Sequence, residues 1–111
     1  MKTKFITFLS ALFTIAFLTG CQSVDVTKTA KGFHAPTNPN EIEILMTRPD
    51  RPYEELGTIT AVKFNPSDTA KMHNAIRAKS APLGANAVIL TGVGMDARDR
   101  QYAIGVAIVW K

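Results

Sequence analysis

The 111-residue sequence predicts an α+β domain over residues 41–111, built as a small four-stranded sheet with one helix packed on one face. Three observations support this fold class. Two β-rich segments precede residue 65, one amphipathic helical stripe follows, and two alternating apolar segments complete the chain. The expected order is therefore β-β-α-β-β, with the sheet and the single helix forming two layers.

The first two strands are expected over residues 41–46 and 56–64. In the first, Ile42, Ile44 and Met46 alternate with the other positions, which is the pattern of a half-buried strand. Residues 47–52 contain two prolines and interrupt it. The second segment is rich in Thr, Ile and Val, and Gly57 within it indicates a bulge or a close backbone approach.

The helix is expected to begin after Asn65, a suitable N-cap, with Pro66 in the first helical position. Because Pro82 disfavours helical geometry at the residue before it, the regular helix should end near Ser80 or Ala81. One stripe of the helix contains Met72, Ala75, Ile76, Lys79 and Leu83. This stripe is the face that we expect to pack on the sheet.

The last two strands are expected over residues 87–93 and 102–110, joined by a charged hairpin loop at residues 95–101. The final strand is apolar on both faces. One face carries Tyr102, Ile104, Val106, Ile108 and Trp110, and the other carries Ala103, Gly105, Ala107 and Val109. We expect the helix on the small-residue face, where it can approach closely; the opposite assignment stays open.

A single helix covers only one face of a sheet, so one apolar face of the final strand should remain uncovered. Exposed apolar patches usually mark a contact surface. The pattern therefore predicts self-association of the domain, or burial of this face against the preceding segment of the chain or against a partner protein.

The first 20 residues have the order of a secretory signal peptide. Lys2 and Lys4 supply positive charge, residues 5–18 carry no charge, and small residues precede Cys21, the only cysteine. The apolar run of about 14 residues is shorter than the roughly 20 that a transmembrane helix needs. Cleavage is expected between Gly20 and Cys21.

The segment Leu18-Thr19-Gly20-Cys21 resembles the lipobox of bacterial lipoproteins. The resemblance implies a thioether-linked diacylglycerol on Cys21 and acylation, for example by palmitate, of the amino group that cleavage releases. The membrane is then a partner, since two or more chains give stable attachment. Gln22, rather than Asp, follows the cysteine, which in enteric lipoproteins implies the outer membrane with the domain facing the periplasm. The alternative is the outer leaflet of the inner membrane.

Residues 21–40 are expected to form the lipidated N-terminus and a flexible tether, because polar and turn-forming residues dominate this segment. Phe33 and His34 are exceptions and are expected to dock on the domain.

The remaining side chains argue against several functions. Residues 1–20 hold two of the 13 basic residues, which leaves 11 scattered basic residues against 9 acidic ones and no basic patch for nucleic acid. Glu54 and Glu55 point to opposite faces of a strand. Met72 is expected in the core and His73 at the surface. Gly92-Val93-Gly94 precedes a hairpin and no helix follows it, which favours strand packing or a bulge over a phosphate loop. No catalytic residues, metal ligands or cofactor site are predicted.

Two segments, residues 51–59 and Leu83-Gly84-Ala85-Asn86-Ala87-Val88-Ile89, resemble the YbjQ and RcsF superfamily of small bacterial lipoproteins. The resemblance spans roughly residues 41–110 and implies the β-β-α-β-β domain. YbjQ-type members are described as oligomeric and heavy-metal binding, and RcsF-type members sense envelope stress with domain cysteines that this chain lacks. We therefore expect a non-catalytic envelope lipoprotein whose domain binds itself or another protein; the alternative is a ligand- or metal-binding stress-sensing module.

Overall fold

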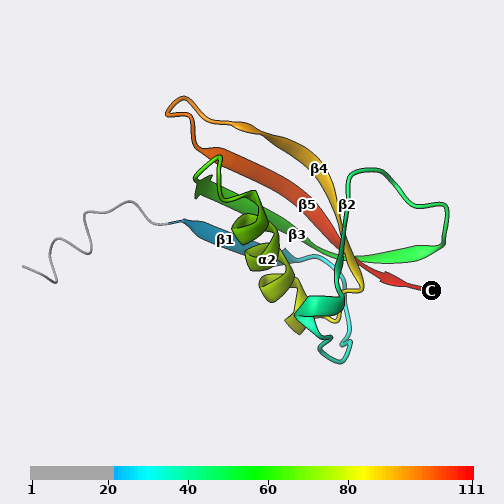
Figure 1. Ribbon diagram of the computed structural model, residues 1–111. Coiled ribbons are helices and arrows are strands. Elements are labelled where there is room, and N and C mark those ends of the chain that lie inside the picture. The colour runs from blue at the N-terminus through cyan, green and yellow to red at the C-terminus, as the bar shows by residue number, and fades with distance from the viewer. Residues whose placement is uncertain (1–21) are drawn as a thin grey trace, which may run out of the picture.

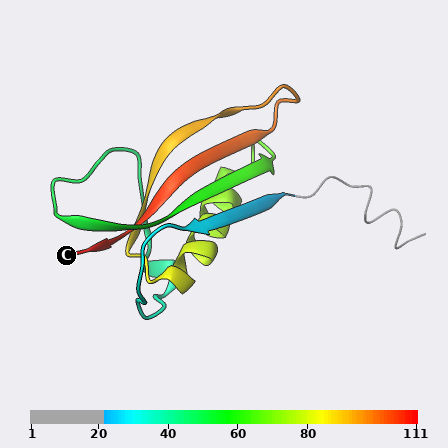
Figure 2. The same cartoon turned by 180° about the vertical axis from the view of Figure 1, so that it is seen from behind.

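The structure is a computed structural model that describes residues 22–111, and it places helix α2 across one face of a mixed five-stranded sheet (Figures 1 and 2). The strands are β1 (Ser23–Lys28), β2 (Glu43–Leu45), β3 (Tyr53–Phe64), β4 (Ala87–Met95) and β5 (Gln101–Trp110). The helices are η1 (Pro39–Glu41), α2 (Thr69–Ser80) and η2 (Ala81–Leu83). The α+β class with one α-helix is confirmed, and the expected number of four strands is corrected to five.

The additional strand comes from the segment that was expected to be a flexible tether. β1 pairs antiparallel with β3, and its Val24 and Val26 pack against the core. Farther along, Thr37 donates from its backbone N–H to Ala81 O at 3.0 Å and from its hydroxyl to Ala85 O at 2.6 Å. Residues 23–28 and 37 are therefore part of the folded unit, which corrects the flexible tether.

The strands are arranged in the order β1-β3-β5-β4-β2, and only β2 and β4 are parallel. β2 is shorter than the strand expected at residues 41–46, because η1 occupies the preceding residues. β3 is longer than expected and shifts register between Glu55 and Gly57. A Cβ on Gly57 would lie 2.7 Å from Thr27 O, so this position confirms both the bulge and the close backbone approach.

Helix α2 begins later than expected. The Asn65 side chain accepts hydrogen bonds from the backbone N–H and hydroxyl of Ser67, and it therefore caps a turn before the helix. The expected end at Ser80 is confirmed. η2 follows, and Gly84 stops the helical path with a positive φ of 85°. A side chain could not replace its hydrogen, because a Cβ would lie 2.5 Å from His34 Cβ.

The core lies between α2 and the small-residue face of β5. Ala103 and Ala107 are fully buried in one cluster with Met72 and Ile76 of the helix. This confirms that the helix covers the small-residue face, and it places the bulky row on the other side of the sheet. Within residues 22–111, no helix is both long enough and apolar enough to cross a membrane.

The segment Gly84-Ala85-Asn86-Ala87-Val88 has a structural explanation. Asn86 donates its backbone N–H to Ile108 O at 2.8 Å, and its side-chain oxygen accepts from the Trp110 N–H at 2.9 Å. The amide thus fixes the end of β5 to the start of β4.

Candidate protein-binding surface

The side of the sheet turned away from α2 carries a strip of branched side chains along β3 and β5, which we call the open face. Its central residues are Thr58, Thr60, Ile104 and Val106. Thr58 pairs with Val106 and Thr60 pairs with Ile104, so these side chains lie side by side. Ile104 is 39% exposed. β1 lies at the sheet edge, so the predicted burial of this face against residues 22–40 is wrong (Figure 2).

One end of the open face carries a second, smaller apolar cluster. Ala87, Ile89 and Ile108 are buried there, and Leu45, Tyr53, Val106 and Trp110 pack against them. The Arg51 guanidinium lies 4.6 Å from the centre of the Trp110 ring, close enough for a cation–π contact. The contact between Arg51 and Trp110 joins the β2–β3 connection to the end of β5.

A cavity of about 320 Å³ opens beside this cluster. It lies between the β2–β3 connection and the open face, and its lining residues are Met46, Arg48, Tyr53, Glu55, Ile89, Leu90, Thr91 and Val106. The volume is at the lower end of the range for ligand sites. The apolar residues of the cavity can accommodate one side chain of a partner. The charged residues Arg48 and Glu55 can bind polar groups of the partner next to that side chain.

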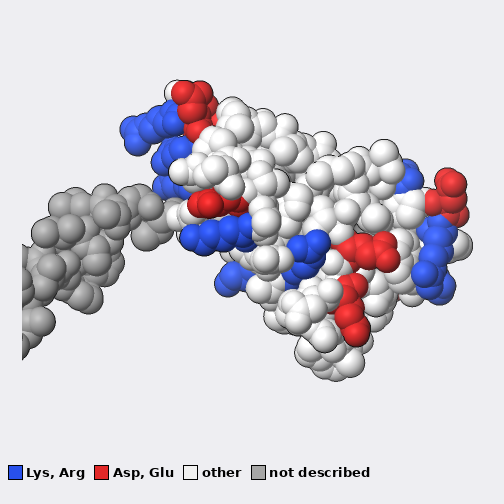
Figure 3. Space-filling model, in the orientation of Figure 1, with Lys and Arg blue, Asp and Glu red and all other residues white. Residues whose placement is uncertain are grey.

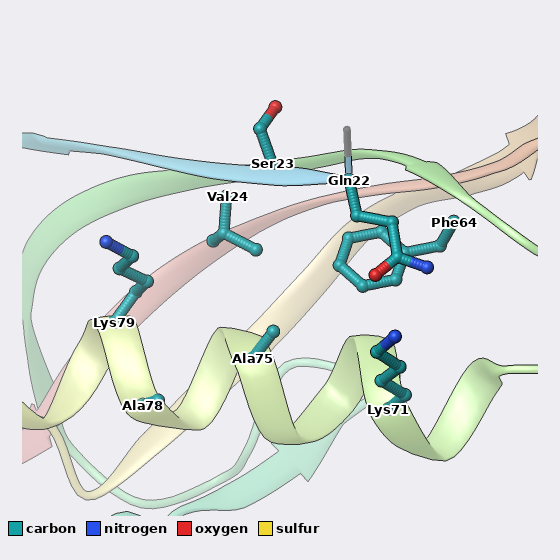
Figure 4. Close-up of a pocket in the computed structure, with 8 residues that line it drawn as sticks. All are labelled: Gln22, Ser23, Val24, Phe64, Lys71, Ala75, Ala78 and Lys79. Carbon is teal, nitrogen blue, oxygen red and sulfur yellow. The ribbon is translucent and has the colours of Figure 1, made fainter. Parts of the chain in front are cut away.

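A second groove, of about 290 Å³, runs between β1 and α2 (Figure 4). Val24, Phe64 and Ala75 form its apolar floor, and the side chains of Lys71 and Lys79 rise from the helix on either side. The groove includes Gln22, so it opens where the described chain begins.

The helix and strand residues singled out in the sequence lie on separate elements, α2 and β3. Met72 is buried as expected, and His73 is half-buried rather than fully at the surface. Burial, together with the nearby charge of Arg77, lowers the pKa of His73 below its usual value. Glu54 and Glu55 pair in register with Val109 and Ile108, on opposite faces of the sheet as expected. No group of three or more His, Cys, Asp or Glu within residues 22–111 could hold a metal ion.

The two exceptions in the expected tether behave differently. His34 Nε2 lies 3.6 Å from Glu54 Oε2, so His34 docks on the domain as expected. Phe33 is 80% exposed, so its expected docking is wrong.

The β4–β5 hairpin is organised by one carboxylate. Asp96 accepts hydrogen bonds from the backbone N–H groups of Arg98 and Arg100, and it pairs with the Arg100 side chain at 2.9 Å. These contacts, led by the Arg100 N–H, lower the pKa of Asp96. β4 shifts register between Leu90 and Gly92, which confirms a bulge in the glycine-containing segment.

The predicted cleavage site at Gly20 and lipid attachment at Cys21 lie outside the described residues. The cavity on the open face has no counterpart among the sequence patterns. Its wall combines Met46 and Arg48 with residues from β3, β4 and β5, and no local pattern brings these segments together. The only signal was the interrupted segment at residues 47–52, which forms part of the connection above the sheet.

The chain matches no protein family model, and no curated protein matches its sequence significantly. One solved structure is similar, the crystal structure of the Francisella virulence factor FvfA in its orthorhombic form. The TM-score is 0.63 at 13% sequence identity, and the match covers 78% of this chain and 97% of that chain. At this identity the similarity shows the fold alone.

Proposed function

We propose that this chain is a lipid-anchored envelope protein whose domain associates with a second copy of itself through the open face and performs no catalysis. The observation that carries the proposal is that Ile104, 39% exposed, and half-buried Val106 lie beside the cavity on the face that no helix covers. Uncovered apolar surface next to a recess is typical of a protein contact site. The lipobox resemblance at Leu18-Thr19-Gly20-Cys21 supports the anchor, and the YbjQ-type resemblance supports oligomer formation.

The position of the anchor favours a symmetric pair. β1 begins at Ser23, two residues after Cys21, so both anchors of a dimer must lie at the same end of the two sheets. A twofold axis parallel to the strands brings two open faces together and keeps both N-termini at that end. Packed sheets keep their strands within about 30° of one another, which this arrangement allows.

Gln22 after the lipidated cysteine supports placement in the outer membrane with the domain facing the periplasm, and inner-membrane retention is the alternative. A ligand- or metal-binding stress-sensing module is the alternative function; residues 22–111 contain no group of three or more His, Cys, Asp or Glu that could hold a metal ion.

Labelling of cells with radioactive palmitate tests the anchor. The wild-type protein should incorporate label and fractionate with the outer membrane, whereas Cys21→Ser should do neither, because the thioether cannot form. A wild-type protein that stays unlabelled would overturn the anchor.

Light scattering of the detergent-solubilised full chain tests the association. The wild-type protein should be a dimer, and Ile104→Glu should be monomeric, because a carboxylate on the open face would be desolvated in the interface. Phe33→Glu is the matched control: Phe33 is exposed but lies outside the open face, so this variant should stay dimeric. A monomeric wild-type protein would reject self-association, and capture of a different envelope protein that Ile104→Glu abolishes would assign the face to that partner.

A further inference from the structure

The start of the described chain, the β3–α2 connection and the β4–β5 hairpin all lie at one end of the sheet (Figures 1 and 2). The register fixes this arrangement. Ser23 pairs with Val62, Phe64 pairs with Gln101, and Gln101 pairs with Met95. Residues 96–100 therefore extend beyond the level at which β1 begins.

A lipid on Cys21 would hold this end close to the bilayer. One residue separates Cys21 from Ser23, and a chain spans at most about 3.6 Å per residue, so the two Cα atoms lie within about 7 Å of each other. Because β1 is paired along its whole length with β3, the rest of the domain cannot move away from Ser23, and so from Cys21, without breaking this pairing. With the strands upright on the bilayer, the hairpin would lie at the level of the lipid headgroups.

The surface of this end suits a bilayer interface. Val93 and Met95, on β4 where β2 no longer covers the edge, are 50% and 52% exposed. Lys63 at the end of β3 and Arg98 in the hairpin loop are exposed at the same end of the sheet, and Figure 3 shows basic side chains over this end with acidic ones among them. Asp96 and Arg100 form an ion pair that adds no net charge to this end, while Asp99 of the same loop is exposed.

We propose that the β4–β5 hairpin rests on the membrane, with Val93 and Met95 entering the boundary between headgroups and acyl chains and with Lys63 and Arg98 contacting lipid phosphates. Apolar side chains flanked by basic ones are the usual composition of interfacial contacts. This inference rests on the proposed lipid anchor. It fixes the orientation of the domain: the strands stand on the bilayer, the open face is directed sideways, and the cavity with Met46 lies at the far end.

Tryptophan quenching in the lipidated full chain tests this orientation. Trp110 is the only tryptophan, so Trp110→Phe provides a silent background. Met95→Trp, Ala97→Trp and Met46→Trp are then compared in vesicles of phosphatidylethanolamine and phosphatidylglycerol that contain a brominated acyl-chain lipid. Met46 is the matched control, a methionine that is 60% exposed at the opposite end. Both hairpin probes should be quenched at least about twofold more than the Met46→Trp probe, because interfacial side chains sit within reach of the acyl chains.

Flotation of the same vesicles separates this inference from the anchor. If the palmitate-labelled protein floats but the hairpin probes are quenched no more than the Met46→Trp probe, lipid attachment is supported. The proposed contact of the β4–β5 hairpin with the membrane is then wrong. If the protein is neither labelled nor floated, the anchor is wrong and the orientation that depends on it falls as well. Greater quenching of Ala97→Trp alone would contradict the insertion of Met95.

Discussion

The two faces of the sheet are built from the same strands but from side chains of different size. On β5, Ala103 and Ala107 lie beneath α2, whereas Ile104 and Val106 point to the open face. A helix backbone can approach a sheet closely only where the side chains are small. The alternation of size along β5 therefore decides which face the helix covers, and it leaves the branched side chains for another surface.

The open face also differs in composition from a core. Its β3 positions next to Ile104 and Val106 are Thr60 and Thr58, whose hydroxyls can be hydrated while their methyl groups pack. In a monomer such a face can be hydrated through its hydroxyl groups. In a dimer the same face buries apolar area against the open face of the second copy. The covered face is not hydrated in either case, because its residues are already buried beneath α2 within one chain.

The largest difference between the faces should appear on truncation of isoleucine. Ile59→Ala on the covered face, where the side chain is 1% exposed, should lower the free energy of unfolding by about 2–5 kcal/mol, because it leaves a cavity under α2. Ile104→Ala on the open face should cost about 1 kcal/mol or less in the monomer. Urea unfolding of both variants under monomeric conditions measures this, and equal costs would contradict the division into a covered and an open face.

Enlarging neighbouring residues of β5 should give a smaller contrast. Ala107→Leu should destabilise the chain by about 1–3 kcal/mol, since the larger side chain must displace α2 or a strand. Val106→Leu, one position away on the open face, should change stability by about 0.5 kcal/mol or less. Thermal unfolding of the two variants makes the comparison, and a well-tolerated Ala107→Leu would show that the helix is not closely packed.

The sequence predicts most of this fold where local patterns are strong. The alternation in β5, Pro82 after the helix and the bulge at Gly57 all lead to the observed structure. β1 was missed because only Val24 and Val26 are apolar in it, so its alternation is short and lies within a polar segment. An edge strand needs few apolar residues, since only one face of it reaches the core.

The candidate surfaces were only partly predictable for a different reason. An uncovered face of β5 follows from its pattern, but the cavity depends on how Met46 and Tyr53 fold over Ile89. The groove at Lys71 depends on β1, which was expected to be a tether. Both recesses form between segments far apart in the sequence, so periodicity within one segment carries no information about them.

The smallest expected effect is a pH dependence that belongs to the covered side alone. Partial burial of the side chain, together with the charge of Arg77, lowers the pKa of His73 below its usual 6.5 in the folded chain. In the unfolded chain His73 keeps the usual value, so as the pH falls through 6.5 the unfolded state binds the proton first. Folding stability is therefore expected to decrease below pH 6.5 and to stop decreasing, for this residue, once the pH is below the folded pKa.

His73→Gln should remove this component, which urea unfolding between pH 7.5 and pH 5 would detect as a flatter dependence of the midpoint on pH below 6.5. The Asp96 carboxylate, whose pKa is also lowered, contributes only at more acidic pH, because its usual value is 3.8. Association through Ile104 and Val106 involves no histidine, so the dimer should persist unchanged over the same range. A midpoint that stays constant in the wild-type chain would contradict the contribution of His73. A dimer that dissociates as His73 becomes protonated would show that the two faces are coupled.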